Sequence, residues 1–386
     1  MLQTGKLRDI AALPRENRNL AKSMSSFLRK AASYVDDASA KKSIRLKILH
    51  IALGHPVTLC FMSVMAAGLI HKIVVDKMTA AEATKDFITL LGCFISCISA
   101  AFWMSYKPGL CIIFTHLADA AQILEEISKS AKKSLQKKMA NVERRGRLPF
   151  YGMWCLATIS FLGSVVTAEF DTDIYLLEGA PSWFRILIEF AHTIQAVGFG
   201  LPGVCSAVLI TLLVSEAIFD SLNDGLRNCD GNEDFLKDLI KVHQELLTAL
   251  MIARNLFRYV LLSHALIWCP ALLLSMLNVL SGCYGVPAMS LLPIGSIVIM
   301  SACEAGDILV RKSLDASQAV IYSGWEDTDA VFRQDVMMIL RRSQRPAYLK
   351  IHLSGMLCRE RMKIFKTMYS AFTIMLSVFD SSTCEA

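Results

Sequence analysis

The chain has 386 residues, of which 54% are hydrophobic and 19% are charged, with a formal net charge of +6. This composition excludes an ordinary soluble domain and is typical of a protein that crosses a membrane several times. The basic residues lie beside apolar runs, where they would set membrane topology, so the positive charge does not indicate nucleic-acid binding.

Seven apolar runs in the sequence are long enough to cross a bilayer as helices, which takes about 20 residues. In chain order they are Leu46–Ile70, Phe87–Tyr106, Pro149–Glu169, Ile186–Phe219, Leu256–Leu280, Val286–Ala305 and Met362–Phe379. The fourth run exceeds the thickness of a bilayer, so we expect it to continue as a helix beyond the membrane. The residues that predict a kink in its middle are Gly198, Gly200, Pro202 and Gly203. Further kinks are predicted in three other runs, at Pro56, Pro270 and Pro293.

Lysine and arginine are distributed unequally between the connections of these runs. They are dense before the first run, between the second and third, and from Arg311 to Lys366, whereas the alternate connections and the tail hold few or none. Because basic segments stay in the cytoplasm, the sequence predicts a cytoplasmic N-terminus and an extracellular C-terminus. A G-protein-coupled receptor would need the opposite orientation, which argues against that class.

Three amphipathic segments between the runs predict cytoplasmic helices, over Leu117–Met139, Phe235–Ala253 and Phe332–Leu340. We expect them to pack together, and against neighbouring subunits, as an anchor below the membrane. The alternative is that they lie on the inner leaflet as interfacial helices. The expected fold is therefore an all-α polytopic membrane protein. Its parts would be a cytoplasmic N-terminal segment (1–45), six membrane helices with a pocket and cytosolic extensions (46–305), the anchor (306–361), and a seventh helix with an extracellular tail (362–386).

The sequence shows no catalytic constellation. It has no Walker loop, no GxSxG and no HExxH, and its twelve cysteines form no CxxC pair and no metal-ligand spacing. We therefore predict that the protein is not an enzyme and has no metal or other cofactor.

Polar and aromatic residues within the apolar runs predict a ligand pocket. In the fourth run, Glu189, His192 and Thr193 share one helical face, and Gln195 follows. A small, mildly polar stripe in the third run comprises Ser160, Gly163 and Thr167, and the second run offers Phe87, Leu91 and Phe94 at similar spacing. Mixed walls of this kind suit a small volatile or lipophilic ligand, and the alternative is ordinary packing between helices.

The C-terminal part of the sequence carries a series of motifs. They are Ile321, Tyr322, Ser323 and Trp325; Phe332 and Arg333; Ser343, Gln344, Arg345 and Pro346; and the last-helix segment Tyr369–Ile374. In this order they resemble insect odorant receptors, which carry an IYSxxW piece, then FR and SQRP, then a helix similar to SYSYFTLL. Gustatory receptors and the odorant co-receptor tend to have Thr-Tyr and a later Gln in the last helix. This chain has Ser370, Ala371 and Ser377 there, so a ligand-tuning odorant receptor is the better match.

The resemblance implies an odorant-binding subunit of a ligand-gated, non-selective cation channel, assembled as a heterotetramer with the odorant co-receptor. It implies a plasma-membrane location, in the dendrite of a sensory neuron, and a pocket in the outer halves of the second, third, fourth and sixth runs, where Met289 lies. The last helix of each subunit would line the pore, with a hydrophobic gate at Ile374 and Val378 and with Ser377 near its outer mouth. The alternatives are a gustatory-type receptor channel and a membrane transporter, although no internal repeat supports a transporter.

Overall fold

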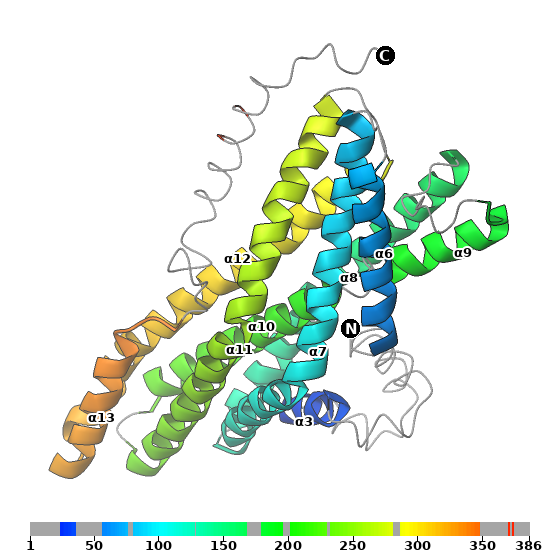
Figure 1. Ribbon diagram of the computed structural model, residues 1–386. Coiled ribbons are helices and arrows are strands. Elements are labelled where there is room, and N and C mark those ends of the chain that lie inside the picture. Colours follow the sequence, from blue (N-terminus) through cyan, green and yellow to red (C-terminus); the bar gives the residue numbers. More distant parts are fainter. Residues whose placement is uncertain are drawn as a thin grey trace.

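The computed structural model describes residues 24–35, 56–75, 80–127, 129–167, 179–195, 201–229, 232–280 and 286–347, together with 370 and 373. Every regular element within them is a helix (Figure 1). The α-helices are α3 (Met24–Val35), α6 (Pro56–Val75), α7 (Ala80–Ile127), α8 (Lys129–Thr167), α9 (Ser182–Thr193), α10 (Leu201–Arg227), α11 (Glu233–Leu280), α12 (Val286–Ile321) and α13 (Ala330–Ser343). A single 3-10 turn, Trp325–Asp327, precedes α13. The predicted all-α fold is confirmed.

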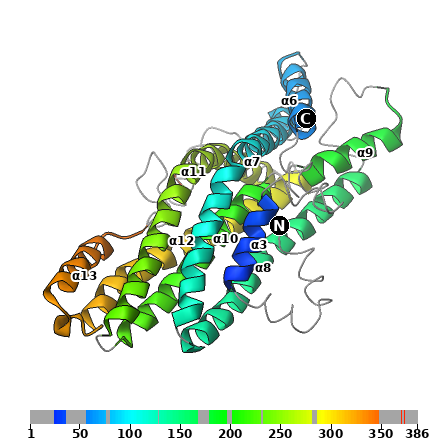
Figure 2. The same ribbon diagram turned by 90° about the horizontal axis from the view of Figure 1, so that it is seen from below.

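The long helices α7, α10, α11 and α12 form the centre of the molecule (Figures 1 and 2). Helices α7 and α11 run antiparallel along each other. This pairing brings His116 beside Glu245 (2.6 Å, Nδ1 to Oε2) and, further along, Ser99 beside His264 (3.2 Å, Oγ to Nε2). At Gly109 a Cβ atom would come within 2.7 Å of Leu256 Cδ1, so a larger residue here would make the Leu256 side chain shift.

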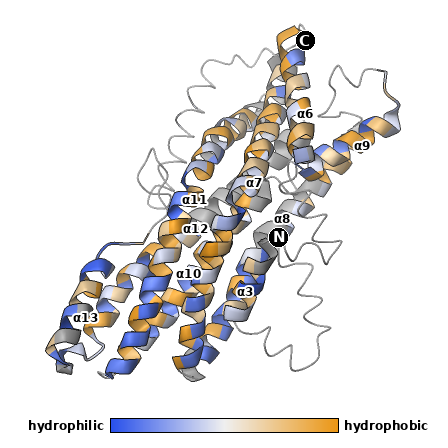
Figure 3. Cartoon of the chain, turned by 60° about the horizontal axis from the view of Figure 1, so that its bottom comes forward, coloured by the Kyte–Doolittle hydropathy of each residue, from blue (hydrophilic) through white to orange (hydrophobic). Residues whose placement is uncertain are grey.

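The helices are too long to lie wholly within a membrane. Both α7 and α11 have 48 residues, a length of about 72 Å against a hydrocarbon core of about 30 Å. Figure 3 shows that their residues change from mixed and hydrophilic near α3 and α13 to mostly hydrophobic near α6. We call the region near α3 and α13 the charged end, and the region near α6 the apolar end.

Membrane-spanning stretches can be identified from length and composition. Within the described residues, four helices qualify as candidate spans, over Thr58–Val75, Asp86–Ile127, Val204–Arg227 and Glu233–Met276. In α11 the part from Tyr259 to Leu280 holds no charged residue, whereas the part from Glu233 to Arg254 holds many. The membrane-spanning part of α11 is therefore its second half, and the first half belongs to the charged end. Exposed apolar side chains such as Val74 (76%) and Val166 (85%) on α6 and α8 match surfaces that face lipid.

Among the described residues, buried apolar side chains form two separate clusters. The large cluster fills the charged end and contains residues of α3, α7, α8, α10, α11, α12 and α13, among them the fully buried Phe219 and Phe257. The small cluster lies between α6 and α7 at the apolar end, with Phe184 and Ile188 of α9 packed against it. The amphipathic segments predicted from the sequence contribute to the large cluster, so they pack together rather than lie separately.

Ion pairs join three helices at the border of the large cluster. Asp220 of α10 accepts Lys138 of α8 at 2.8 Å and Lys312 of α12 at 2.6 Å, and this hydrogen bond raises the pKa of Lys312. Nearby, Arg145 of α8 contacts Glu216 of α10 at 2.9 Å. These side chains are half-buried, where ion pairs are less screened by solvent and salt than fully exposed ones.

The turn between α12 and α13 explains several C-terminal motif residues. Gly324 has a left-handed backbone (φ 71°), which ends the preceding turn, and Trp325 then packs against the large cluster. Ser323 is fully buried and donates to the Val320 carbonyl at 2.8 Å. Ser343 Oγ, at the other end of α13, lies 3.4 Å from His243 Nε2 of α11. These residues fix how α13 folds back on the bundle.

One prediction about the helices is wrong, and others are restricted by the bounds of the observed helices. The segment Leu117–Met139 is not one helix, because α7 ends at Ile127 and α8 begins at Lys129. The helices of the second, fifth and sixth runs also continue without interruption into the charged end, and α11 continues through Pro270. In the fourth run α9 ends at Thr193 and α10 begins at Leu201, and residues 196–200, which include Gly198 and Gly200 of the predicted kink, lie outside the described residues.

Part of the sequence prediction lies outside the described residues. This holds for residues 46–55 of the first run, so that Pro56 is the first residue of α6. It also holds for the seventh run except Ser370 and Thr373.

Candidate functional site

The predicted pocket residues fall on four helices. Helix α7 carries Phe87, Leu91 and Phe94, and α8 carries Ser160, Gly163 and Thr167. Helix α9 ends with His192 and Thr193, and Gln195 follows it. Helix α12 carries Met289 near its start. Of these, the residues of α7 and α9 have side chains that the structure describes in full.

The aromatic residues of α7 form an open face. Phe87 is 42% exposed, Phe94 is 40% exposed, and Leu91 between them is half-buried. Their spacing places all three on one side of the helix. An apolar face of this size, open among the described residues, can serve as one wall of a pocket for a lipophilic ligand.

Helix α9 buries its polar face and exposes its apolar face. Glu189, His192 and Thr193 are all buried, and Gln195 after them is buried as well. Trp183, Leu187 and Phe190 are exposed on the other side. This arrangement is the reverse of a helix on a soluble protein, and it fits a helix whose outer surface faces lipid and whose polar groups face the protein interior.

The polar face of α9 meets α7 at His192. The Nε2 atom of His192 lies 3.6 Å from Cys93 Sγ, beside Phe94 in the sequence. The Nδ1 atom of His192 is buried and makes no hydrogen bond within the described part of the chain. A buried nitrogen with unused hydrogen-bonding capacity can bind a polar group of a ligand, because leaving it unpaired is unfavourable.

The third helix of the predicted pocket lies beside α9. Phe161 of α8 packs edge-to-face against Phe190 of α9, with ring centroids 5.1 Å apart, and Gly163 is half-buried. The side chains of Ser160, Thr167 and Met289 lie outside the described part. The structure thus places His192 of α9 against Cys93 of α7, next to Phe94 in the sequence, and the pocket as a whole remains a prediction.

Sequence reasoning missed an ion pair next to this site. Lys72 Nζ of α6 lies 3.0 Å from Asp86 Oδ2 of α7, and Asp86 is only 3% exposed. Asp86 directly precedes Phe87 in the sequence, and the pair joins α6 and α7 at the apolar end. The sequence could have predicted this ion pair, because Lys72 follows the first apolar run and Asp86 precedes the second, and a short connection joins the two runs.

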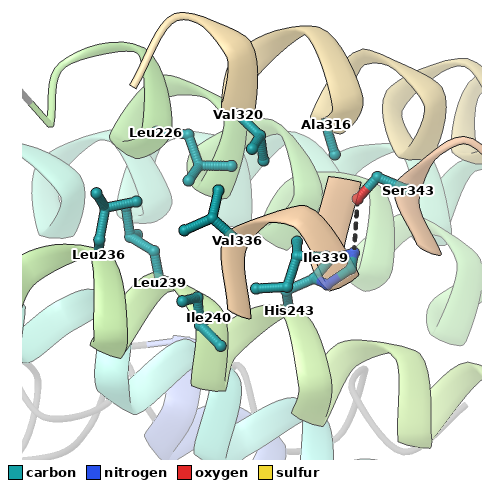
Figure 4. A pocket seen from close by; sticks show the side chains of 10 residues that line it. All are labelled: Leu226, Leu236, Leu239, Ile240, His243, Ala316, Val320, Val336, Ile339 and Ser343. Atoms are coloured by element: carbon teal, nitrogen blue, oxygen red, sulfur yellow. Dashed lines mark hydrogen bonds between the residues drawn. The ribbon is translucent and has the colours of Figure 1, made fainter. Parts of the chain in front are cut away.

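The charged end holds a cavity between α10, α11, α12 and α13 (Figure 4). Its walls are apolar apart from His243 and Ser343, and its volume of about 10 Å³ is at the lower limit for one water molecule. It cannot hold an odorant. Burial, and secondarily the charge of Arg342, lowers the pKa of His243 to about 4, so the imidazole is neutral in the folded protein at pH 7.

We expect His243 to make the protein less stable in acid. Its pKa is lower in the folded chain than the ordinary value of 6.5, so its contribution is fully present above pH 6.5 and is lost as the pH falls towards 4. The loss should approach about 3 kcal/mol near pH 4. Melting temperatures of the purified protein between pH 7.5 and 4 would show a smaller decline in His243→Asn than in the wild type. The exposed His71, changed to Asn, is the control, and equal declines in all three proteins would contradict the assignment.

The predicted gate residues Ile374, Ser377 and Val378 lie outside the described residues. Their roles therefore rest on the sequence alone.

Comparison with known proteins gives two findings. The family model of the 7tm odorant receptors matches residues 79–372. The fold is similar to the structure of the insect olfactory receptor OR5 from Machilis hrabei, with a TM-score of 0.74 and 13% identity, covering 94% of this chain and 98% of that chain. The structure of the same receptor in complex with eugenol gives a TM-score of 0.71 and 11% identity, with the same coverage. A search of curated proteins finds no match.

These findings agree with the helices and with the C-terminal motifs. At such low identity the solved structures establish the fold, and the family match, which covers more than half of the chain, establishes the family. The protein is therefore a membrane chemoreceptor and not an enzyme. The chain belongs to the 7tm odorant receptor family.

Proposed function

We propose that this chain is the odorant-binding subunit of a ligand-gated, non-selective cation channel. It would act in the plasma membrane of a sensory dendrite, with its N-terminus in the cytoplasm, in a heterotetramer with the odorant co-receptor. The family match over residues 79–372 is the observation that carries this proposal.

The ligand would be a small volatile held between the aromatic face of α7 and the buried polar face of α9. Phe87, Leu91 and Phe94 would supply apolar contact, and His192 a hydrogen bond to a polar group of the odorant. The remaining members of the proposed pocket are Ser160, Gly163, Thr167, Thr193, Gln195 and Met289. The eugenol bound in the similar OR5 structure supports a ligand of this size.

Opening would follow from a difference in affinity. A ligand with micromolar affinity has a binding free energy of about 8 kcal/mol, but only the part that differs between the closed and open states can shift the equilibrium. The last helix would respond by moving Ile374 and Val378 away from the pore axis, so that water and cations enter a constriction that is otherwise dry.

The test of this function is whole-cell current in cells that express the chain alone or together with an insect odorant co-receptor. A panel of volatiles is applied, and surface labelling confirms that the chain reaches the plasma membrane. We expect odorant-evoked cation current only in the cells that express both proteins. Current from the chain alone would refute the requirement for a co-receptor, and silence in both cases across the panel would count against the channel.

Replacing Phe94 with alanine is expected to raise the half-maximal odorant concentration about tenfold. The substitution removes an aromatic wall worth about 1.5–3 kcal/mol of apolar contact, and about 1.4 kcal/mol corresponds to tenfold. Leu187→Ala is the control, because Leu187 is 52% exposed on the outward face of α9. Equal shifts in both variants, measured as concentration–response curves, would remove Phe94 from the pocket.

A further inference from the structure

A crevice opens between α11 and the C-terminal end of α13. Its volume is about 300 Å³, and its lining includes two arginines and no carboxylate. Arg254 comes from α11 and Arg342 from α13, and both are exposed. Met251, which is 60% exposed, and Pro346 supply apolar surface beside them.

The two guanidinium groups make the crevice suitable for an anion. Arg342 donates from Nη1 to the Arg345 carbonyl at 3.3 Å, which uses one of the five N–H groups of a guanidinium. The planar fork of arginine matches the geometry of phosphate oxygens.

The crevice lies where α11 enters the membrane. Arg254 stands at the end of the charged half of α11, and the uncharged stretch from Tyr259 to Leu280 that follows is about 33 Å long, close to the thickness of a hydrocarbon core. Between them, Arg258 donates to the Tyr259 hydroxyl at 2.7 Å and lies over its ring at 4.6 Å. A tyrosine with this surrounding is typical of the boundary between membrane and water.

We propose that this crevice binds the phosphorylated headgroup of an anionic membrane lipid, of the phosphoinositide class. Arg254 and Arg342 hold the phosphates, and Met251 contacts the start of an acyl chain. Basic pockets between helices at the membrane surface bind such headgroups, and the apolar lining favours a lipid over a free anion. The site is separate from the proposed odorant pocket and does not depend on it.

The test uses the purified full chain in detergent. Binding of dioctanoyl phosphatidylinositol 4,5-bisphosphate is measured by thermophoresis, with dioctanoyl phosphatidylcholine as the uncharged comparison. We expect Arg254→Gln and Arg342→Gln each to weaken binding of the bisphosphate lipid by about fivefold. Arg341→Gln is the matched control, since Arg341 is an exposed neighbour on α13 that does not line the crevice, and it should retain wild-type affinity.

Three outcomes would overturn the proposal. The first is an equal loss in Arg341→Gln and Arg342→Gln, which would leave only general charge attraction. The second is equal affinity for inositol 1,4,5-trisphosphate, which has the phosphates without acyl chains and would identify a free anion as the ligand. The third is wild-type affinity in the double variant Arg254→Lys, Arg342→Lys, which is measured if the glutamine variants do not fold. This pair keeps the charge without the planar fork and should bind several-fold more weakly, so wild-type affinity would exclude the site.

Discussion

Replacing Phe219 with alanine is expected to destabilise the protein by about 3–5 kcal/mol. Phe219 is fully buried on α10 in the large cluster, with its ring centroid 6.3 Å from that of His243. The substitution removes the apolar contacts of the ring and leaves a cavity that the surrounding long helices cannot close without shifting. The measurement is the temperature at which half of the detergent-solubilised protein remains monodisperse.

The control for Phe219 is another large aromatic residue of the charged end. Tyr322 is 72% exposed at the end of α12, so Tyr322→Ala should change the midpoint little. If both variants lowered the midpoint equally, the charged end would not have the packed interior described above.

Replacing Ile374 with serine is expected to raise the basal current about tenfold or more. In the proposed gate an isoleucine side chain keeps the closed pore dry, and exchanging it for a hydroxyl removes about 1.5–3 kcal/mol of that preference per subunit. About 1.4 kcal/mol in the equilibrium between closed and open states corresponds to tenfold. The measurement is leak current without odorant in cells that also express the co-receptor.

Ile374→Val separates polarity from a general disturbance of the last helix. Valine keeps the position apolar and changes its volume by one methylene, so the basal current should remain close to that of the wild type. A wild-type basal current in Ile374→Ser, at equal surface expression, would place the gate elsewhere.

The sequence was sufficient for the helical architecture but not for every reversal of the chain. Apolar runs located α6, α10 and the second half of α11, because burial in lipid imposes strong compositional limits, and amphipathic spacing located α13. The reversal after Ile127 was missed. Apolar positions at Leu124, Ile127 and Leu135 continue a helical period across it, and neither glycine nor proline marks Ser128 and Lys129.

The candidate site could be predicted only in part for a related reason. A polar residue such as His192 can be recognised in an apolar run as a candidate site residue, because its exposure to lipid would be costly. Its contact with Cys93 and the pair of Lys72 with Asp86 join residues that are distant in the sequence, and no local pattern encodes which helices meet. The motif residues Ser323 and Trp325 were found through the family resemblance, and their structural reason, the turn before α13, appeared only in three dimensions.

The separation of the interior into two clusters bears on how receptors of this kind can diversify. The large cluster at the charged end includes none of the α7 and α9 residues proposed for the pocket, and among the described residues the small cluster contacts α6, α7, α9 and Ala180 just before α9. In the proposed pocket, substitutions near Phe94 or His192 would therefore alter chemical preference while the packing of the charged end stays intact. The proposed ligand preference would then diversify by mutation of one region, with the packed interior of the other inherited unchanged.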